Sequence, residues 1–555
     1  MRALAERNVL GRLASRPLQA ILIAIALAGV GCSKVSTHAG GALQASGQTV
    51  PGVIRYAIPN DLNTLNPVLG GLAYENAIEA AVFDALVKLD DQQRLVPDLA
   101  TEIPTRANGG ISADGKTITY HLRRGVLWQD GAPLTSADVA FTFAKIMDPS
   151  VNAPNSGPYT HIQSIATPDA YTVVVHLRAP WAPAIGQLFC NGENGSIIPK
   201  HLLENSKDFN HDLFGIHPVG SGPFRLARWG RGSDILLEAN DRYFAGRPKI
   251  RTVVVQIIPD ANTRLTTLTS HALDFATIGN PAEVAALRRV PGLRVLLVKN
   301  YSLTFVEFNV TRSPVDDVLV RRALVMALDR PMLTERTFVG TAIPADSFIP
   351  PFSWAYDADN ASPPFDFAGA KRLLETAGWR AGPDGIRSKG TQRLAFDLLI
   401  STGSATAIAL AEQLQQSWRA LGVDVSVRSE PLNVLRSPTG LLVTGQFQAA
   451  LLSFIFDPDP DRSVNLGSQF IGPRGFNDMR YRSAQSDDLA AAAVAVYDHA
   501  QRKPFYGELQ RVWNRDLPIV PIAWDDNIDV INADWRGFRP EPVNSDLWNA
   551  VQWQI

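Results

Sequence analysis

The sequence has almost no cysteine and no apolar run long enough to cross a membrane. Only Cys32 and Cys190 occur among 555 residues, which excludes a disulfide framework. The apolar run Leu18–Ala28 is shorter than the roughly 20 residues that a spanning helix needs. Hydrophobic cores must therefore stabilise the chain, and Cys190, within the segment Leu188-Phe189-Cys190, is predicted to be a small buried hydrophobic residue.

The sequence also lacks the common catalytic and metal-binding motifs. It contains no G-x-S-x-G, H-E-x-x-H or C-x-x-C pattern, and its nine histidines form no helical i,i+4 pair. A formal net charge of −2 gives no basic footprint for nucleic acid. We therefore expect no cofactor, no metal centre and no nucleic-acid partner.

The N-terminus has the features of an export signal. Basic residues precede the apolar run, and the small residues Gly29-Val30-Gly31 lead into Cys32. This end resembles a bacterial lipobox, although Gly29 stands where leucine is usual. We predict a lipoprotein-type signal peptide over 1–32 with lipidation at Cys32, followed by a flexible tether over 33–50 that is rich in Ser, Gly, Ala and Thr.

The segment 117–149 has the most specific pattern in the chain. Thr117 to Leu122 alternates β-branched or aromatic residues with others, which predicts a half-buried strand after the turn Asp114-Gly115. Thr135 is a candidate N-cap with Asp138 three residues later. The apolar stripe that follows, Val139, Phe143 and Ile146, predicts a helix that ends before Pro149.

The sequence of this segment resembles the signature of the family 5 extracytoplasmic solute-binding proteins, the peptide- and nickel-type receptors of ABC importers. The matching positions are Leu122-Arg123-Arg124-Gly125, Trp128, Asp130-Gly131, Pro133-Leu134-Thr135, Ala137-Asp138-Val139, Phe141 and Phe143. A second match runs from Asn309 to Arg330, and Val219 to Phe224 resembles the family's "vGTGPY" turn with serine for threonine. The resemblance extends over about 50–555.

The resemblance implies an α/β fold with two lobes, the type II, cluster C fold of periplasmic binding proteins, with an additional inserted α/β subdomain. The implied division is lobe I in three parts (51–79, 217–300 and 533–555), the insertion over 80–216, and lobe II over 301–532. Local patterns agree with an α/β chain. They predict strands at Val53–Ile58 and Phe305–Asn309, a helix at Ala77–Leu89, and helix ends at Gly378 and Gly422.

The acidic segment after the strand Ala449–Phe456 is the leading candidate site. Its alternating Asp and Pro residues, Asp457 to Asp461, form a stiff loop but fail the calcium pattern of an EF-hand at Arg462 and Ser468. In peptide-binding members of the family an aspartate at this place holds the ligand's α-ammonium, which the resemblance assigns here to Asp457. A solvated acidic turn is the alternative.

Other candidates for lining the ligand cleft lie before this loop in the sequence. They are Asn63, Leu65, Asn66, Tyr301, Ser302, Trp354, Phe454 and Phe456. Each of them could equally be a packing residue.

The resemblance predicts an extracytoplasmic receptor of an ABC importer that captures a peptide between two lobes and delivers it to the membrane permease. Its implied partners are the peptide, the permease and ATPase subunits, and the membrane through a lipid anchor, and we expect a monomer. Two alternatives stay open. One is a receptor for a nickel chelate, haem or an opine-like conjugate, and the other is a secreted hydrolase that uses Asp457, Asp459 and Asp461.

Overall fold

The computed structural model describes residues 49–191, 195–473, 475–541 and 547–555. The chain divides into the units Met1–Gln44 and Ala45–Ile555, and all of the described residues belong to the second. The predicted signal peptide, the lipidation site Cys32 and nearly all of the tether lie outside the described residues. No helix in the described part is long and apolar enough to cross a membrane.

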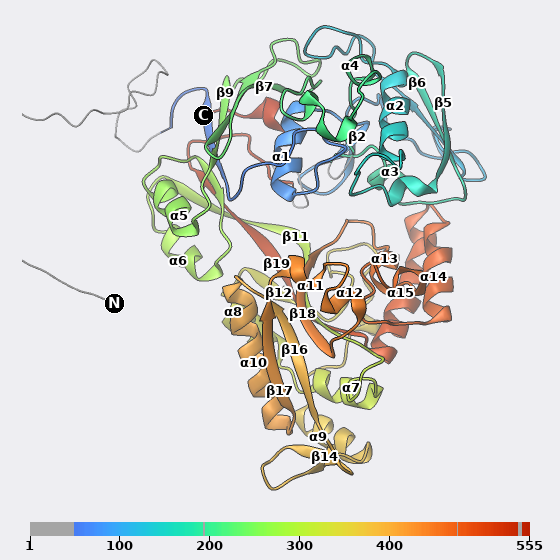
Figure 1. The fold of residues 1–555 in the computed structure, drawn as a ribbon, viewed down its shortest axis with the longest axis vertical. Helices are drawn as coiled ribbons and strands as arrows, with labels where there is room; N and C mark the ends of the chain where they lie inside the picture. Colours follow the sequence, from blue (N-terminus) through green and yellow to red (C-terminus); the bar gives the residue numbers. More distant parts are fainter. Residues whose placement is uncertain (1–48, 192–194, 474, 542–546) are drawn as a thin grey trace, which may run out of the picture. The chain divides into compact units, whose positions relative to one another are not determined.

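One large mixed sheet runs through the molecule (Figure 1). Its strand order is β17-β16-β18-β11-β19-β10-β1-β9-β8-β7, and β12 pairs with β19 beside this path. These strands are β1 (Val53–Ile58), β7 (Phe224–Gly230), β8 (Asp234–Ala239), β9 (Thr252–Ile257), β10 (Phe275–Thr277), β11 (Leu293–Phe308), β12 (Ala342–Pro344), β16 (Ala395–Ser401), β17 (Asp424–Glu430), β18 (Ala449–Ile455) and β19 (Ile519–Asn532).

The strands β11 and β19 connect the two lobes. They are antiparallel neighbours from the pair Leu293–Asn532 at one end to Glu307–Ile519 at the other. The first half of β11 and the second half of β19 pack in a cluster with β10 and α5, whereas the second half of β11 and the first half of β19 pack in the cores of lobe II. The register shifts between Lys299 and Ser302, near the middle of the pair.

Lobe I and the inserted segment share one continuous hydrophobic core, so from here on lobe I denotes both of them together. This core contains Ile54 and Val253 from the large sheet together with Ile118, Tyr120 and Val173 from a three-stranded sheet, β4-β6-β5. The remaining elements of this part are β2 (Val87–Leu89), β3 (Leu95–Pro97), β4 (Thr117–His121), β5 (Ile162–Asp169), β6 (Thr172–Leu177), α1 (Ala73–Val82), α2 (Ser136–Ile146), α3 (Ala184–Gln187), α4 (Lys200–Leu203), α5 (Ala261–Thr269) and α6 (Val284–Leu287).

Lobe II packs helices on both faces of its half of the sheet. One face is covered by α7 (Val318–Met326), α8 (Arg330–Phe338), α9 (Phe367–Thr376) and α10 (Ala405–Leu421). The other packs against α11 (Leu432–Leu435), α12 (Leu441–Thr444), α13 (Ser463–Leu466), α14 (Ala484–Val494) and α15 (His499–Asp516). A small sheet of β13 (Arg380–Ala381), β14 (Arg387–Lys389) and β15 (Gln392–Arg393) lies outside this arrangement.

Several local predictions are confirmed. The helix predicted after Thr135 is α2, and the Thr135 amide donates to Asp138 Oδ2 at 2.8 Å as a capping box requires. Gly378 and Gly422 follow α9 and α10 with positive φ, as expected of helix C-termini. The two-lobed α/β fold class is confirmed, whereas the residue bounds of the predicted domains stay a prediction.

The predicted helix Ala77–Leu89 is wrong at both ends. The helix α1 begins at Ala73 and ends at Val82, and Val87–Leu89 is the strand β2. The chain leaves the helix at Asp84, whose carboxylate accepts a hydrogen bond from the Tyr243 hydroxyl at 2.8 Å, while its amide donates to Ser221. Long-range polar contacts therefore override the apolar pattern that favoured a longer helix.

Candidate functional site

The loop after β18 holds three aspartates with different partners. Asp459 accepts two hydrogen bonds from the Arg502 guanidinium, at 2.8 and 2.9 Å. Asp461 accepts bonds from the amide and hydroxyl of Ser463, at 3.0 and 2.5 Å. Asp457 has one hydrogen bond from a described residue, from Nε2 of Gln187 at 3.1 Å. Two carboxylates therefore hold the loop in shape, and Asp457 remains for another role.

Gln187 lies at the end of α3 in lobe I, so its bond to Asp457 joins the two lobes. Asp457 keeps an exposed surface although many protein atoms surround it. Burial raises the pKa of its carboxyl, the charge of Arg462 opposes this rise, and Asp459 and Asp461 reinforce it. A cation bound here would favour the ionised form.

Arg462 is a buried charge directly beside this carboxylate loop. It is 2% exposed, and its Nη1 donates to the carbonyl oxygens of Asp459 and Asp461 at 2.6 and 3.0 Å. Its Cζ lies 4.5 Å from the centre of the Phe456 ring. Its Nε and Nη2 have no hydrogen-bond partner among the described residues. Burial lowers the pKa of this guanidinium, and the charge of Asp457 is the largest influence in the opposite direction.

Aromatic residues predicted from the sequence gather around the loop. The rings of Phe454 and Phe456 lie 4.9 Å apart, and the amide of Phe456 donates to the Tyr301 carbonyl. Trp354 stacks on His499 at 4.1 Å and lies beneath Arg502, the partner of Asp459. The structure therefore brings Tyr301, Trp354, Phe454, Phe456 and Asp457 into one region of lobe II.

Ser302 lies on the other face of β11 from Tyr301. It is 8% exposed and donates its hydroxyl to Asp525 Oδ2 at 2.9 Å. Thr304 donates to the second oxygen of the same carboxylate, at 3.1 Å. Burial raises the pKa of Asp525 to about 6, while the bonds from Ser302 and Thr304 oppose the rise. Ser302 thus takes part in a polar cluster between the two connecting strands.

The three lobe I candidates lie in a turn that Glu75 holds. The Asn63 amide donates to Glu75 Oε1 at 2.6 Å, and the Leu65 amide donates to the Gly215 carbonyl at 2.7 Å. Leu65 and Asn66 are fully buried, and Asn63 is exposed. The structure does not bring these residues into contact with Asp457 in any hydrogen bond or ring contact of the described chain. Their role in ligand binding stays a prediction.

Further contacts between the lobes lie beside the Gln187–Asp457 bond. The Tyr497 hydroxyl, between α14 and α15, donates to the Gly115 carbonyl at 2.9 Å, and Arg106 lies over the Tyr497 ring. Gly115 has a φ of +69°, and a Cβ there would lie 2.9 Å from the Tyr497 ring. The predicted turn at Asp114-Gly115 is confirmed, and its glycine also makes room for the opposite lobe.

Cys190 lies close to the same interface. It is 5% exposed within the core of lobe I, which confirms the prediction of a buried hydrophobic residue. Burial raises the pKa of its thiol, and the charges of Glu541 and Asp457 add to the rise. The thiol is therefore neutral and inert at physiological pH.

Gln187 is the functional candidate that the sequence did not reveal. It lies in a four-residue helix with no motif around it. Its importance depends on a contact with a residue 270 positions away, which no local pattern encodes.

Two lobes that meet across an aspartate, joined by two adjacent strands, define a protein that encloses a small molecule between its halves. The profile described as "Bacterial extracellular solute-binding proteins, family 5 Middle" matches residues 94–470. The chain therefore belongs to family 5 of the bacterial extracellular solute-binding proteins, as the sequence predicted.

Relatives and solved structures agree with this assignment. Protein XP55 of Streptomyces lividans is 28% identical over 530 residues, covering 95% of this chain and 93% of its own. Oligopeptide-binding protein AppA of Bacillus subtilis is 27% identical over 496 residues, covering 86% and 87%. The structure of AppA with a nonapeptide has a TM-score of 0.75 at 25% identity, covering 91% of this chain and 99% of AppA. NikZ of Campylobacter jejuni, solved with Ni(L-His), has a TM-score of 0.78 at 23% identity, covering 91% and 100%, and shows the shared fold.

Proposed function

We propose that the protein is the extracytoplasmic receptor of an ABC importer and that it binds a peptide between its lobes, with Asp457 accepting the ligand's terminal ammonium. The observation that carries this proposal is the state of the acidic loop. Asp459 and Asp461 are bound within lobe II, while Asp457 faces the opposite lobe and has only the neutral amide of Gln187 as a described partner. An ammonium group makes a stronger, charge-assisted bond to a carboxylate than an amide does.

The relatives support the peptide as ligand class. Over most of its length the chain is similar to a protein named for oligopeptide binding, whose structure holds a nonapeptide. An extended peptide can be bound through its main chain while its side chains occupy roomy pockets. Of the aromatic residues around the loop, the half-buried Trp354 and Phe454 would form apolar surface near such a ligand, whereas Tyr301 and Phe456 are buried in the core beneath them.

The proposed mechanism is closure of the lobes around the ligand. A bound peptide would contact Asp457 from lobe II and the end of α3 from lobe I, and so would favour the closed form. The receptor would then pass the peptide to permease and ATPase subunits without making or breaking a bond. We further propose that it acts as a monomer, anchored to the membrane by a lipid on Cys32.

Calorimetry with peptides tests the ligand and the role of Asp457 together. The mature protein is titrated with tri- to nonapeptides and with the same peptides acetylated at the amino terminus. The variant Asp457→Asn should bind free peptides at least tenfold more weakly, because a charge-assisted bond contributes about 1.5–3 kcal/mol. Wild type should bind acetylated peptides as weakly as Asp457→Asn binds free peptides. Asp461→Asn, which keeps an acceptor for Ser463, is the matched control and should bind within about threefold of wild type.

Other results would overturn the proposal. If peptide pools give no heat while small polar solutes do, the ligand is not a peptide. A metal or chromophore in the purified protein would instead favour a nickel-chelate or haem receptor. Steady hydrolysis of a peptide or glycan, lost in Asp457→Asn, would show an enzyme.

A further inference from the structure

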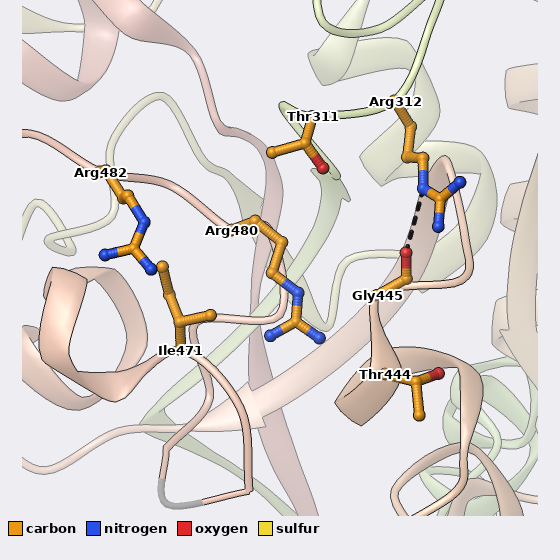
Figure 2. Close-up of a pocket in the computed structure, with 7 residues that line it drawn as sticks. All are labelled: Thr311, Arg312, Thr444, Gly445, Ile471, Arg480 and Arg482. Carbon is orange, nitrogen blue, oxygen red and sulfur yellow. Dashed lines mark hydrogen bonds between the residues drawn. The ribbon is translucent and has the colours of Figure 1, made fainter.

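A hollow lined by three arginines lies in lobe II, outside the region of Asp457. It has a volume of about 430 Å³ and lies between the chain that follows β11, the end of α12 and the residues Ile471, Arg480 and Arg482. Figure 2 shows the guanidinium groups of Arg312, Arg480 and Arg482 arranged around it, with Thr311 and Thr444 at its edge. No carboxylate lines this hollow among the described residues.

The three arginines keep most of their hydrogen-bonding capacity. Arg312 donates from Nε to the Gly445 carbonyl at 3.2 Å, and Arg480 donates from Nη2 to the Val443 carbonyl. No ion pair to Arg312, Arg480 or Arg482 is found among the described residues. Each guanidinium carries five N–H donors and stays charged, so the hollow presents several unpaired donors and three positive charges.

Arg480 is fixed in this position by unusual backbone geometry. Its φ is +59°, a left-handed conformation that a side-chain-bearing residue seldom adopts. Gly445 has a φ of +69°, and a Cβ on it would lie 2.5 Å from Nε of Arg480. Gly445 therefore gives the guanidinium its space, and the close approach orients Arg480 into the hollow.

The acidic groups behind the hollow do not cancel its charge. Asp478 is 1% exposed and pairs with Arg436 at 3.0 Å. Glu307 is 2% exposed, and burial, followed by the charge of Asp478, raises its pKa well above the usual range, while the charges of Arg436 and Arg480 oppose the rise. Arg436 pairs directly with Asp478, and the charge of Arg480 also lowers the pKa of this carboxyl, so Arg312 and Arg482 keep their positive charges without an acidic partner among the described residues.

We propose that this hollow binds an anion of the phosphate class. Guanidinium groups bind phosphate oxygens through paired, parallel N–H···O bonds, and three of them around one hollow match a multiply charged oxyanion. The anion could be free in solution or could be the head group of an anionic phospholipid, because both present the same phosphate oxygens.

The site is separate from the proposed peptide site. The hollow lies where the chain enters β18, and Asp457 follows its other end. Seven strand residues lie between, which at about 3.3 Å per residue places the two sites roughly 20 Å apart. Anion binding here is therefore independent of whether Asp457 binds a peptide.

The test measures anion binding by the full-length mature receptor in buffer without phosphate or sulfate. Calorimetry is done with inorganic phosphate and pyrophosphate, and sedimentation with vesicles of phosphatidylglycerol or of phosphatidylcholine. The variants Arg312→Gln and Arg482→Gln change exposed side chains, so folding should be preserved. Each should weaken binding about tenfold or more, as expected for a lost charge-assisted bond. Arg419→Gln, which removes an exposed arginine paired with Asp424, is the matched control and should change nothing.

Each outcome decides a different part of the proposal. Binding of phosphate or pyrophosphate without vesicle binding supports a free anion. Binding to phosphatidylglycerol vesicles that phosphatidylcholine does not share, lost in both variants, supports a lipid head group. If neither soluble anions nor vesicles bind, or if both variants bind like wild type, the proposal is overturned. If these variants still bind peptides, the two sites bind their ligands independently, so the anion proposal can be wrong while the peptide proposal is right.

Discussion

At the residue scale, the site depends on which partners the four charged side chains of one short loop have. Asp459 and Asp461 have bonds that hold the loop, while Arg462 has two nitrogens without a described partner and lies close enough to Asp457 to affect its charge. A buried carboxylate beside two others would tend to take up a proton. Arg462 counteracts this tendency, so it prepares Asp457 for a cationic ligand.

Arg462→Met should change the pH dependence of peptide binding. Burial raises the pKa of Asp457, and affinity for an ammonium falls as pH decreases through that pKa. Without Arg462 the pKa rises further, so the fall should begin at a higher pH than in wild type. Calorimetry from pH 5 to 8 measures both profiles. Arg231→Met, which removes an arginine stacked 3.7 Å from Trp229 in lobe I, should match wild type. Identical profiles for Arg462→Met and wild type would contradict this role.

Glu79 makes the stability of lobe I depend on pH. It is 2% exposed, and burial, followed by the charge of Glu75, raises its pKa from 4.5 to about 8. The folded state therefore holds a proton that the unfolded state releases, so this contribution to stability is complete below pH 4.5 and is lost as pH rises through about 8. Each pKa unit corresponds to about 1.4 kcal/mol.

Glu79→Gln should remove this dependence. Above pH 8 the variant should unfold at a higher urea concentration than wild type, and its free energy of unfolding should be larger by a few kcal/mol at most. Between pH 5 and 8 its free energy of unfolding should vary less than that of wild type. Glu75→Gln is the comparison, since Glu75 accepts amide bonds from Asn63, Gly71 and Leu72. Glu75→Gln should instead lower the free energy of unfolding by about 1–3 kcal/mol. A Glu79→Gln variant that is less stable than wild type at pH 8.5 would contradict the prediction.

At the element scale, α15 supports the loop from behind. Arg502 is 2% exposed and binds Asp459, the Ala493 carbonyl and the Tyr506 hydroxyl. Arg502→Met should cost about 3–5 kcal/mol, because it leaves Asp459 half-buried without its partner. Arg511→Met removes an exposed arginine of the same helix that pairs with Glu508, and should change stability by less than about 0.5 kcal/mol. Equal urea midpoints for the two variants would show that the Arg502 pair does not hold the loop.

The elements that were predictable from sequence are those with a local signal. Thr135 with Asp138 marked the start of α2, and Gly378 and Gly422 marked helix ends, because caps depend on neighbouring residues alone. The strand β11 was predicted only from Phe305, although it begins at Leu293. Lys299, Asn300 and Ser302 interrupt its apolar pattern, and their partners lie on β19, more than two hundred residues away.

The residues of the candidate site also differ in whether a local sequence signal reveals them. Phe454, Phe456 and Asp457 could be predicted because they lie at the end of one recognisable strand or directly after it, where the family resemblance locates the ligand, and the structure places Tyr301 and Trp354 near them. Gln187 and Arg462 were not singled out, since one acts across the lobes and the other through burial. Contacts of this kind depend on tertiary structure and leave no periodic trace in the sequence.

At the scale of the whole molecule, the contacts between lobes set how readily the receptor closes. The Tyr497 hydroxyl bond to the Gly115 carbonyl exists only when the lobes meet. Tyr497→Phe should therefore favour the open form and weaken ligand binding roughly fivefold, since a neutral hydrogen bond contributes about 1 kcal/mol. Small-angle scattering at partial saturation should show a larger radius of gyration than for wild type. Tyr171→Phe, whose ring contacts Arg124 within lobe I, should leave both measurements unchanged. An unchanged affinity in Tyr497→Phe would show that this contact does not contribute to closure.

The connection through β11 and β19 also restricts how the two lobes can move relative to each other. Because the two strands are hydrogen-bonded neighbours along nearly their whole length, one cannot slide or swing without the other. The irregular register near Lys299 is the place where a ribbon of this kind twists most easily. Opening should thus follow a single rotation about one axis, so that one pair of spectroscopic labels, one per half, would report the full course of ligand capture.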